Sequence, residues 1–294
     1  MTSPRAKLRR FATPFPLLST SVGAVLALGL LPAAAAAEGR AATRADQQFT
    51  SYAFAHEFGS GVYDFNGRTL QVYGLPFGWT FLDRTEQNPG LRLRLPVTLG
   101  FLDFRSADVI EIGLPDQVDS VSFVPGVEVE FVVAEHWHVL PYVQVGKSLA
   151  NESDVETDLF GTGVRAERRF AAGRFDGLYA GEGIFSQVRY RGDGLPDDDF
   201  LRIRNGVELT RGTGRALGGK PLAYGVFAAV DAFVDPPTGP RTGIDVPRTQ
   251  LEMGGVFGTQ PALRLWKVPL PRVGLSYRFA GDLSAVRIVL GAPF

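Results

Sequence analysis

The chain has 294 residues, of which 45% are hydrophobic and 21% charged, and it contains no cysteine. The lack of cysteine excludes a disulfide framework, a zinc–thiolate or iron–sulfur centre and a cysteine nucleophile. Its 30 basic and 31 acidic residues give a net charge of −1, which provides no reason to expect a nucleic-acid partner. The length fits one large all-β domain or two domains of ordinary size.

The first 37 residues have the pattern of a secretory signal peptide. Four basic residues between positions 5 and 10 precede an apolar run over 17–31. An alanine tract follows, and residues 35–37 fit an Ala-x-Ala cleavage site before Glu38. The alternative is a membrane anchor, but the apolar run is short for a span and the cleavage site follows it at once. We therefore expect residues 1–37 to be a cleaved signal peptide.

Beyond residue 48 the sequence alternates repeatedly between apolar and polar or small side chains. Between Val121 and Val133, apolar residues share one face of a strand, while Ser122, Glu128 and Glu130 lie on the other. Such runs are about 10–14 residues long, long enough for strands that cross a bilayer obliquely. Twelve strands are predicted, over 49–58, 69–82, 91–104, 118–133, 137–149, 155–170, 175–191, 200–212, 221–234, 248–259, 270–280 and 284–294.

This pattern predicts an all-β fold, a transmembrane antiparallel up-and-down β-barrel over 49–294, in the outer membrane of a Gram-negative cell. A soluble barrel also alternates, with its apolar face inward. We favour the membrane barrel because the polar face is rich in Gly, Ser and Arg, and because longer outer loops alternate with shorter inner turns. The outer loops are predicted at 59–68, 105–117, 150–154, 192–199, 235–247 and 281–283. Residues 38–48 form a short segment that could fold into the lumen.

The end of the sequence resembles the C-terminal assembly signal of Gram-negative outer-membrane proteins. Val286, Ile288 and Leu290 alternate toward the terminal Phe294, while Ala292 stands where a larger apolar residue is common. The resemblance implies that the outer-membrane assembly machinery is a partner of this chain.

Two segments carry a more specific resemblance. Residues 89–104 read PGLRLRLPVTLGFLDF and residues 123–131 read FVPGVEVEF, followed by Trp137 and Pro141-Tyr142. They are similar to the solitary outer-membrane autotransporter β-barrels, and the strand order resembles that of an autotransporter barrel, which has twelve strands. The resemblance implies the barrel without a passenger, since about eleven residues separate the expected cleavage site from the first strand.

Charged residues recur on the inward face of the predicted strands. An arginine facing lipid at the midplane would cost about 2–4 kcal/mol, which favours inward placement. The candidates for setting the selectivity of the lumen are Arg92, Arg94, Glu128, Glu130, Arg165, Arg169, Arg202, Arg204, Arg272, Arg278 and Arg287. Glu167, Glu208, Asp231 and Glu252 share that face. The charges form either cross-strand ion pairs that plug the lumen or a polar channel with a slight preference for anions.

Other chemistry is sparse. The spacing of His136 and His138 puts both imidazoles on one face of a strand, which is compatible with a metal, but no third ligand is evident. Trp137 between them fits an interfacial aromatic girdle. No Ser–His pair or Gly-x-Ser-x-Gly motif is recognisable. We therefore expect no catalytic residue, no metal and no cofactor.

The sequence thus predicts an integral outer-membrane barrel that is structural or forms a pore for small solutes. The alternative is a surface interaction or adhesion protein that uses acidic outer loops. Two acidic groups in or beside these loops, which either bind Ca²⁺ through their oxygens or are simply solvated, are Glu152, Asp154, Glu156 and Asp158, and Asp197, Asp198 and Asp199. A further alternative is an enzyme that modifies outer-membrane lipids. The expected partners are outer-membrane lipids and lipopolysaccharide, the assembly machinery and small solutes.

Overall fold

The structure, a computed structural model, describes residues 59–65, 68–85, 87–103, 120–150, 156–191, 197–236, 246–265, 268–269 and 271–294. The chain divides into two units, Met1–Gly39 and Arg40–Phe294, and every described residue belongs to the second. The predicted signal peptide, the segment 38–48 and the predicted strand 49–58 lie outside the described residues. In the described ranges no helix is long and apolar enough to cross a membrane.

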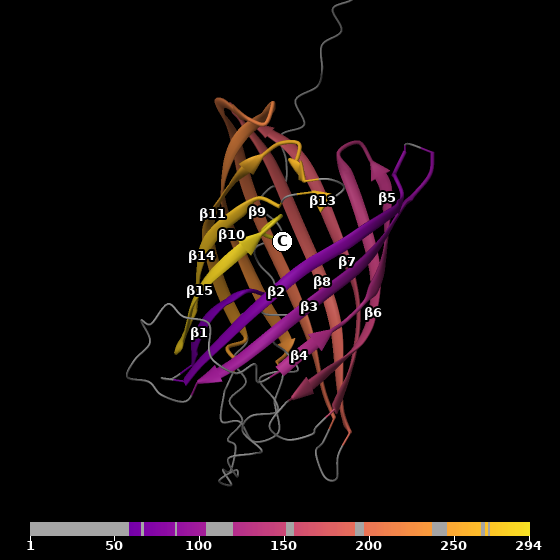
Figure 1. Ribbon diagram of the computed structural model, residues 1–294, viewed down its shortest axis with the longest axis vertical. Coiled ribbons are helices and arrows are strands. Elements are labelled where there is room, and N and C mark those ends of the chain that lie inside the picture. Colours follow the sequence, from indigo (N-terminus) through magenta and orange to yellow (C-terminus); the bar gives the residue numbers. More distant parts are fainter. Residues whose placement is uncertain are drawn as a thin grey trace, which may run out of the picture. The chain divides into compact units, whose positions relative to one another are not determined.

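The described part of the second unit is an antiparallel β-barrel (Figure 1). Its strands are β1 (Gly61–Phe65), β2 (Arg68–Leu82), β3 (Gly90–Asp103), β4 (Ser120–Phe123), β5 (Gly126–Ala134), β6 (Trp137–Ala150), β7 (Glu156–Ala172), β8 (Phe175–Arg191), β9 (Asp198–Leu217), β10 (Lys220–Asp235), β11 (Thr249–Thr259), β14 (Val273–Ala280) and β15 (Leu283–Leu290). β4 and β5 are two parts of one wall strand, so the wall has 12 strands. β12 (Arg264–Leu265) and β13 (Val268–Pro269) form a separate two-stranded ribbon.

The sheet closes on itself. From β2 it runs through β1 and β15, then down the strand numbers from β14 to β3, and β3 pairs back on β2. Closure lets neighbouring strands satisfy each other's backbone N–H and C=O groups, which a strand structure requires in hydrocarbon. The predicted fold class is therefore confirmed.

The strand bounds differ from the predicted ones by one to three residues at several ends and by five at the end of β9, which continues to Leu217 where the prediction ends at 212. Three other differences have a local cause. β1 lies within the predicted outer loop 59–68, because a strand of 5 residues is too short to show a clear alternation. The predicted strand 118–133 is interrupted at Val124–Pro125, since proline has no N–H to donate to the ladder. The predicted strand 284–294 ends as β15 at Leu290, and the next residue, Gly291, has a φ of +93°.

The two ends of the barrel differ in their connections. Two-residue turns at 135–136, 173–174 and 218–219 join strands at one end, which we call the turn end. At the opposite end, the loop end, adjacent strands are separated in the sequence by 104–119, 151–155, 192–197 and 236–248, and by the short turn 281–282. Long loops on one side and short turns on the other are typical of outer-membrane barrels, whose long loops are extracellular.

Apolar side chains gather inside the barrel in two places, although the alternation predicts a polar interior. The loop-end cluster consists of the buried residues Tyr63, Leu70, Val72, Val124, Leu159, Val188, Tyr190, Phe200, Phe233, Leu283 and Ala285. The turn-end cluster consists of Phe227, Val256 and Val289, with Phe294 packed against them. The exterior is also apolar, and side chains such as Phe81, Val145 and Leu275 are exposed there.

Candidate functional site: the charge belt of the lumen

Between the two apolar clusters lies a belt of charged side chains. Along β10, Phe233 belongs to the loop-end cluster, Asp231 to the belt and Phe227 to the turn-end cluster. Along β15, Ala285, Arg287 and Val289 repeat the same order. We call the following residues the charge belt: Arg92, Arg94, Glu128, Arg165, Glu167, Glu182, Arg202, Arg204, Asp231, Glu252, Arg278 and Arg287.

Glu252 on β11 is the centre of the densest part of the belt. Its Oε2 lies 2.8 Å from Nη2 of Arg204 and 2.9 Å from Nη2 of Arg278. Arg287 donates to both of its carboxylate oxygens, and Ser276 Oγ donates to Oε1 at 2.6 Å. Only 1% of Glu252 and 1% of Arg278 is exposed, so these charges are held away from water.

Asp231 on β10 joins the same network. Its Oδ2 lies 2.6 Å from Nη1 of Arg204 and 3.2 Å from Nη2 of Arg278, and its Oδ1 lies 3.7 Å from Nε of Arg202. The strand register explains these pairs: Asp231 stands opposite Arg204 between β10 and β9, and Glu252 stands opposite Arg278 between β11 and β14. The register therefore brings opposite charges together on the inward face.

The belt continues around the wall through β8 and β6. Arg202 Nη2 lies 3.4 Å from Oε2 of Glu182, and Tyr142 Oη donates to Oε1 of the same carboxylate at 2.9 Å. The guanidinium of Arg94 lies 4.6 Å from the centre of the Tyr142 ring, at cation–π distance. Sequence reasoning missed Glu182, because the inward face of β8 mixes it with apolar residues such as Ala180 and Ile184.

Glu128 on β5 gathers the remaining arginines. It lies 3.2 Å from Arg92, 4.0 Å from Arg94 and 3.4 Å from Arg165. Arg165 also lies 3.1 Å from Glu167 on its own strand. This side of the belt is wetter than the side around Glu252, since 46% of the Arg92 side chain and 33% of the Arg94 side chain is exposed.

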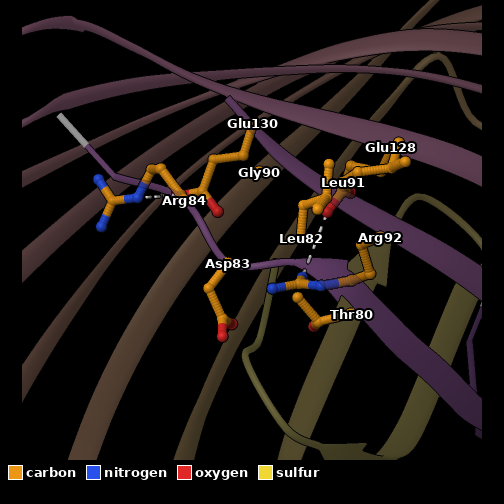
Figure 2. Close-up of a pocket in the computed structure, with 9 residues that line it drawn as sticks. All are labelled: Thr80, Leu82, Asp83, Arg84, Gly90, Leu91, Arg92, Glu128 and Glu130. Carbon is orange, nitrogen blue, oxygen red and sulfur yellow. Dashed lines mark hydrogen bonds and ion pairs between the residues drawn. The ribbon is translucent and has the colours of Figure 1, made fainter. Parts of the chain in front are cut away.

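A small cavity opens beside this wetter side at the turn end, and we call it the turn-end pocket (Figure 2). It has a volume of about 240 Å³ and is lined by Thr80, Leu82, Asp83, Arg84, Gly90, Leu91, Arg92, Glu128 and Glu130. Figure 2 shows Arg84 beside Glu130, with its Nε 3.1 Å from Oε1. His138 Nδ1 lies 2.8 Å from the same oxygen, so one carboxylate holds a guanidinium and an imidazole at the rim.

The structure places the predicted lumen residues in three groups. Eight of them belong to the belt, namely Arg92, Arg94, Glu128, Arg165, Arg202, Arg204, Arg278 and Arg287. Glu130 lines the turn-end pocket, and Arg272 forms a separate pair with Glu208, 3.0 Å from its Oε2. Arg169 is exposed near the turn end and forms no ion pair with a described residue, so it lies outside the belt.

The spacing of the two histidines predicts that they share a strand face, and this prediction is wrong. His136 is in the turn before β6, with a φ of +68°, whereas His138 is on β6 and contacts Glu130. Within the described ranges, no group of three His, Cys, Asp or Glu side chains could hold a metal ion. Trp137 belongs to an aromatic group at the turn end. The centre of its ring lies 6.2 Å from the centre of the Tyr179 ring and 5.6 Å from the guanidinium carbon of Arg168.

The four residues of the predicted assembly signal are not on one face. Val286 and Ile288 on β15 are exposed on the exterior, and Leu290 is half-buried. The ring of Phe294 instead contacts Phe227 inside the barrel, with 5.9 Å between ring centres. The turn at Gly291 redirects the last residues into the lumen, where Figure 1 shows the C-terminus.

The acidic residues at the loop end are mostly paired or turned inward. Glu156 pairs with Lys147, and Asp158 Oδ2 lies 2.7 Å from Nε of Arg191. Asp198 at the start of β9 is buried, while Asp197 and Asp199 are exposed. Glu152 and Asp154 lie outside the described residues.

Comparison with known proteins finds no matching family model and no matching curated protein. Among solved structures, the chain is similar to the β domain of the Bordetella autotransporter BrkA. The two chains share 12% sequence identity with a TM-score of 0.51, over 78% of this chain and 94% of that domain. LpxR from Salmonella typhimurium is also similar, with 12% identity and a TM-score of 0.40 over 78% of this chain and 90% of that chain.

The likeness to the BrkA domain extends over nearly the whole of that domain. At this level of identity the similarity shows the fold. The chain is therefore an outer-membrane-type β-barrel with the fold of an autotransporter β domain.

Proposed function

We propose that this protein is a closed, non-conducting barrel of the Gram-negative outer membrane, with a structural rather than an enzymatic role. The loop-end cluster carries the proposal. Its members come from β7, β8, β9 and β10 on one side and from β1, β2 and β15 on the other. β11 and β14 separate β10 from β15 in the sheet and contribute no member, so the cluster spans the lumen.

The charge belt supports a closed lumen independently. In a water-filled pore, charged residues on the wall remain hydrated, and exposed ion pairs contribute little to stability. Here the belt residues Asp231, Glu252 and Arg278 are each only 1% exposed. Buried charges of this kind persist when they are paired and hydrogen-bonded, as Asp231, Glu252 and Arg278 are. The part of the belt around these three residues therefore acts as a packed layer of the interior.

The exterior supports the membrane location. Large apolar side chains are exposed on the outward faces of β5, β6, β10 and β14, among them Val133, Val145, Val226 and Leu275. An outward apolar band is what a barrel presents to lipid. Export by the predicted signal peptide and insertion by the outer-membrane assembly machinery complete this proposal.

Planar-bilayer recording of the refolded barrel tests the proposal. We expect insertion without stable unitary current steps. The double variant Phe200→Ala/Phe233→Ala removes two rings of the loop-end cluster that lie 5.9 Å apart, and we expect it to show current steps. The control variant Phe160→Ala removes an exposed exterior ring and should stay silent. Stable steps from the unaltered barrel would overturn the proposal.

A second candidate function is a narrow pore that prefers anions. The observation in its favour is the exposure of Arg92 and Arg94 beside the turn-end pocket. Rings of basic side chains favour anions in pores. If the barrel conducts, the reversal potential in a salt gradient should indicate anion preference, and Arg92→Gln/Arg94→Gln should reduce it. Conduction without this change would exclude these two arginines as the selectivity residues.

A further inference from the structure

Three rows of outward-facing residues cross β6, β7 and β8 in register near the loop end. The row nearest the middle of the barrel is Val145, Phe160 and Gln187. The next row is Lys147, Asp158 and Arg189, and the last is Leu149, Glu156 and Arg191. Because successive rows are two residues apart along each strand, they are separated by about 7 Å. The exterior therefore changes from apolar to charged within one step of the pleat.

The charged rows form a hollow on the outside of the wall. It has a volume of about 620 Å³, and its lining includes Lys147, Asp158, Arg189 and Arg191. Half of each long basic side chain is open to the surroundings, with 51% of Lys147 and 56% of Arg191 exposed. Val145 and Phe160 form its apolar floor toward the middle of the barrel.

The acidic residues of the hollow position its basic residues. Glu156 pairs with Lys147, and Asp158 holds Arg191 through an Nε–Oδ2 contact of 2.7 Å. Arg189 stands opposite Asp158 in the register, two residues before Arg191 on β8, and it forms no ion pair with any described residue. Among the described residues, the two charged rows hold three basic and two acidic side chains, an excess of one positive charge. An anion can therefore bind at Arg189 without displacing an existing pair.

We propose that this hollow binds the phosphorylated headgroup of an outer-leaflet lipid, with its acyl chains along Val145 and Phe160. These residues point out of the barrel. In the proposed membrane location, a ligand there meets lipid rather than the lumen. Arginine suits a phosphate because its guanidinium donates parallel hydrogen bonds, and basic pockets at the interface bind lipid headgroups. This inference rests on the proposed membrane location but not on whether the lumen conducts.

The test is a lipid-binding titration of the folded barrel in detergent, followed by native mass spectrometry. The probe is lipid A with both phosphates, compared with dephosphorylated lipid A and with inorganic phosphate. We expect Lys147→Gln/Arg189→Gln to weaken binding of the phosphorylated lipid about tenfold or more. Dephosphorylated lipid A should bind to the unaltered barrel as weakly as phosphorylated lipid A binds to the double variant. Inorganic phosphate should not displace the phosphorylated lipid.

The matched control is Arg168→Gln/Arg211→Gln. These arginines lie against Trp137 and Phe175 near the turn end, so the control removes the same number of charges elsewhere on the barrel. It should leave lipid affinity within about twofold of the unaltered barrel. Arg189→Gln alone serves if the double variant does not fold, since its loss breaks no ion pair in the described residues.

Three results would overturn the proposal: equal affinity in Lys147→Gln/Arg189→Gln, equal affinity for dephosphorylated lipid A, or displacement by inorganic phosphate. Bilayer recordings of the same variants separate this inference from the proposed closed lumen. The exterior substitutions should leave the current record unchanged, whatever that record shows.

Discussion

The ring of Phe294 lies directly over Gly206 of β9, where a Cβ atom would come within 2.1 Å of the ring. The preceding carbonyl, that of Pro293, accepts a hydrogen bond from Arg204 at 3.2 Å, and the Phe294 ring meets Phe227 edge-on. A glycine on the wall thus makes room for the end of the sequence to pack against the charge belt from the turn end. Pro293 and Phe294 therefore connect the belt, through Arg204, to the turn-end cluster, through Phe227.

We predict that Gly206→Ala displaces the Phe294 ring, because the new methyl group occupies its position. Overpacking of this kind costs about 1–3 kcal/mol. Urea unfolding of the refolded barrel, followed by the heat-dependent gel shift, should show a lower midpoint. Gly183→Ala on β8 is the matched control, since a Cβ there meets nothing within 4 Å. Equal midpoints for the two variants would contradict the contact.

Deletion of Phe294 separates its packing from its predicted role in assembly. Inside the barrel the ring packs against the turn-end cluster and contacts Phe227, so its loss should lower the stability of a barrel refolded in detergent, without any assembly machinery. As an assembly signal, it should also reduce the yield of folded barrel in cells. Unchanged cellular yield with reduced stability in detergent would mean that the residue acts only through packing.

Glu252→Gln should be among the most destabilising single substitutions in the barrel. It removes the carboxylate charge shared by Arg204, Arg278 and Arg287, and leaves Asp231 as the nearest anion. Removing one partner of a buried ion pair lowers the free energy of unfolding by about 3–5 kcal/mol. The loss appears as a lower urea midpoint. Glu135→Gln, at a turn where 90% of the side chain is exposed, should leave the midpoint unchanged.

Gly146→Ala tests the break between β4 and β5. A Cβ on Gly146 of β6 would lie 2.0 Å from the backbone oxygen of Phe123 and 2.5 Å from the Cα of Val124. Because backbone atoms cannot move aside as a flexible side chain does, we expect a loss of about 1–3 kcal/mol. Gly212→Ala is the control, since its nearest neighbour is 4.0 Å away. A thermal melt monitored by circular dichroism would show the difference, and coincident melts would contradict it.

Strand alternation made the barrel predictable from the sequence. In the run 118–133 the inward face was identified correctly at Ser122 and Glu128, and the structure buries both. A strand's period of two residues fixes which side chains share a face, so the inward arginines of the belt could also be named. Strands as short as β1 fall below the length at which such a pattern is distinct.

The packing of the lumen could not be predicted, because the strand period says nothing about which inward residues meet across the barrel. Phe200 and Leu283 share the loop-end cluster although they lie far apart in the sequence. The place of Phe294 was also hidden. Alternation up to Leu290 continues toward the end of the sequence, but the positive φ at Gly291 takes the last residues inward. Sequence reasoning therefore located the charges and missed the apolar layers that enclose them.

The central claim is that the lumen is closed to water around the buried part of the belt at Asp231 and Glu252, and thiol accessibility tests it most directly. The chain has no cysteine, so a single engineered cysteine reports without background. Ala229 is 3% exposed and lies on β10 between Phe227 and Asp231. We predict that Ala229→Cys in the folded barrel resists a small charged thiol reagent and reacts after unfolding in urea, while Glu135→Cys at the turn reacts at once. Rapid labelling of the folded Ala229→Cys barrel would show a water-filled lumen and contradict the account.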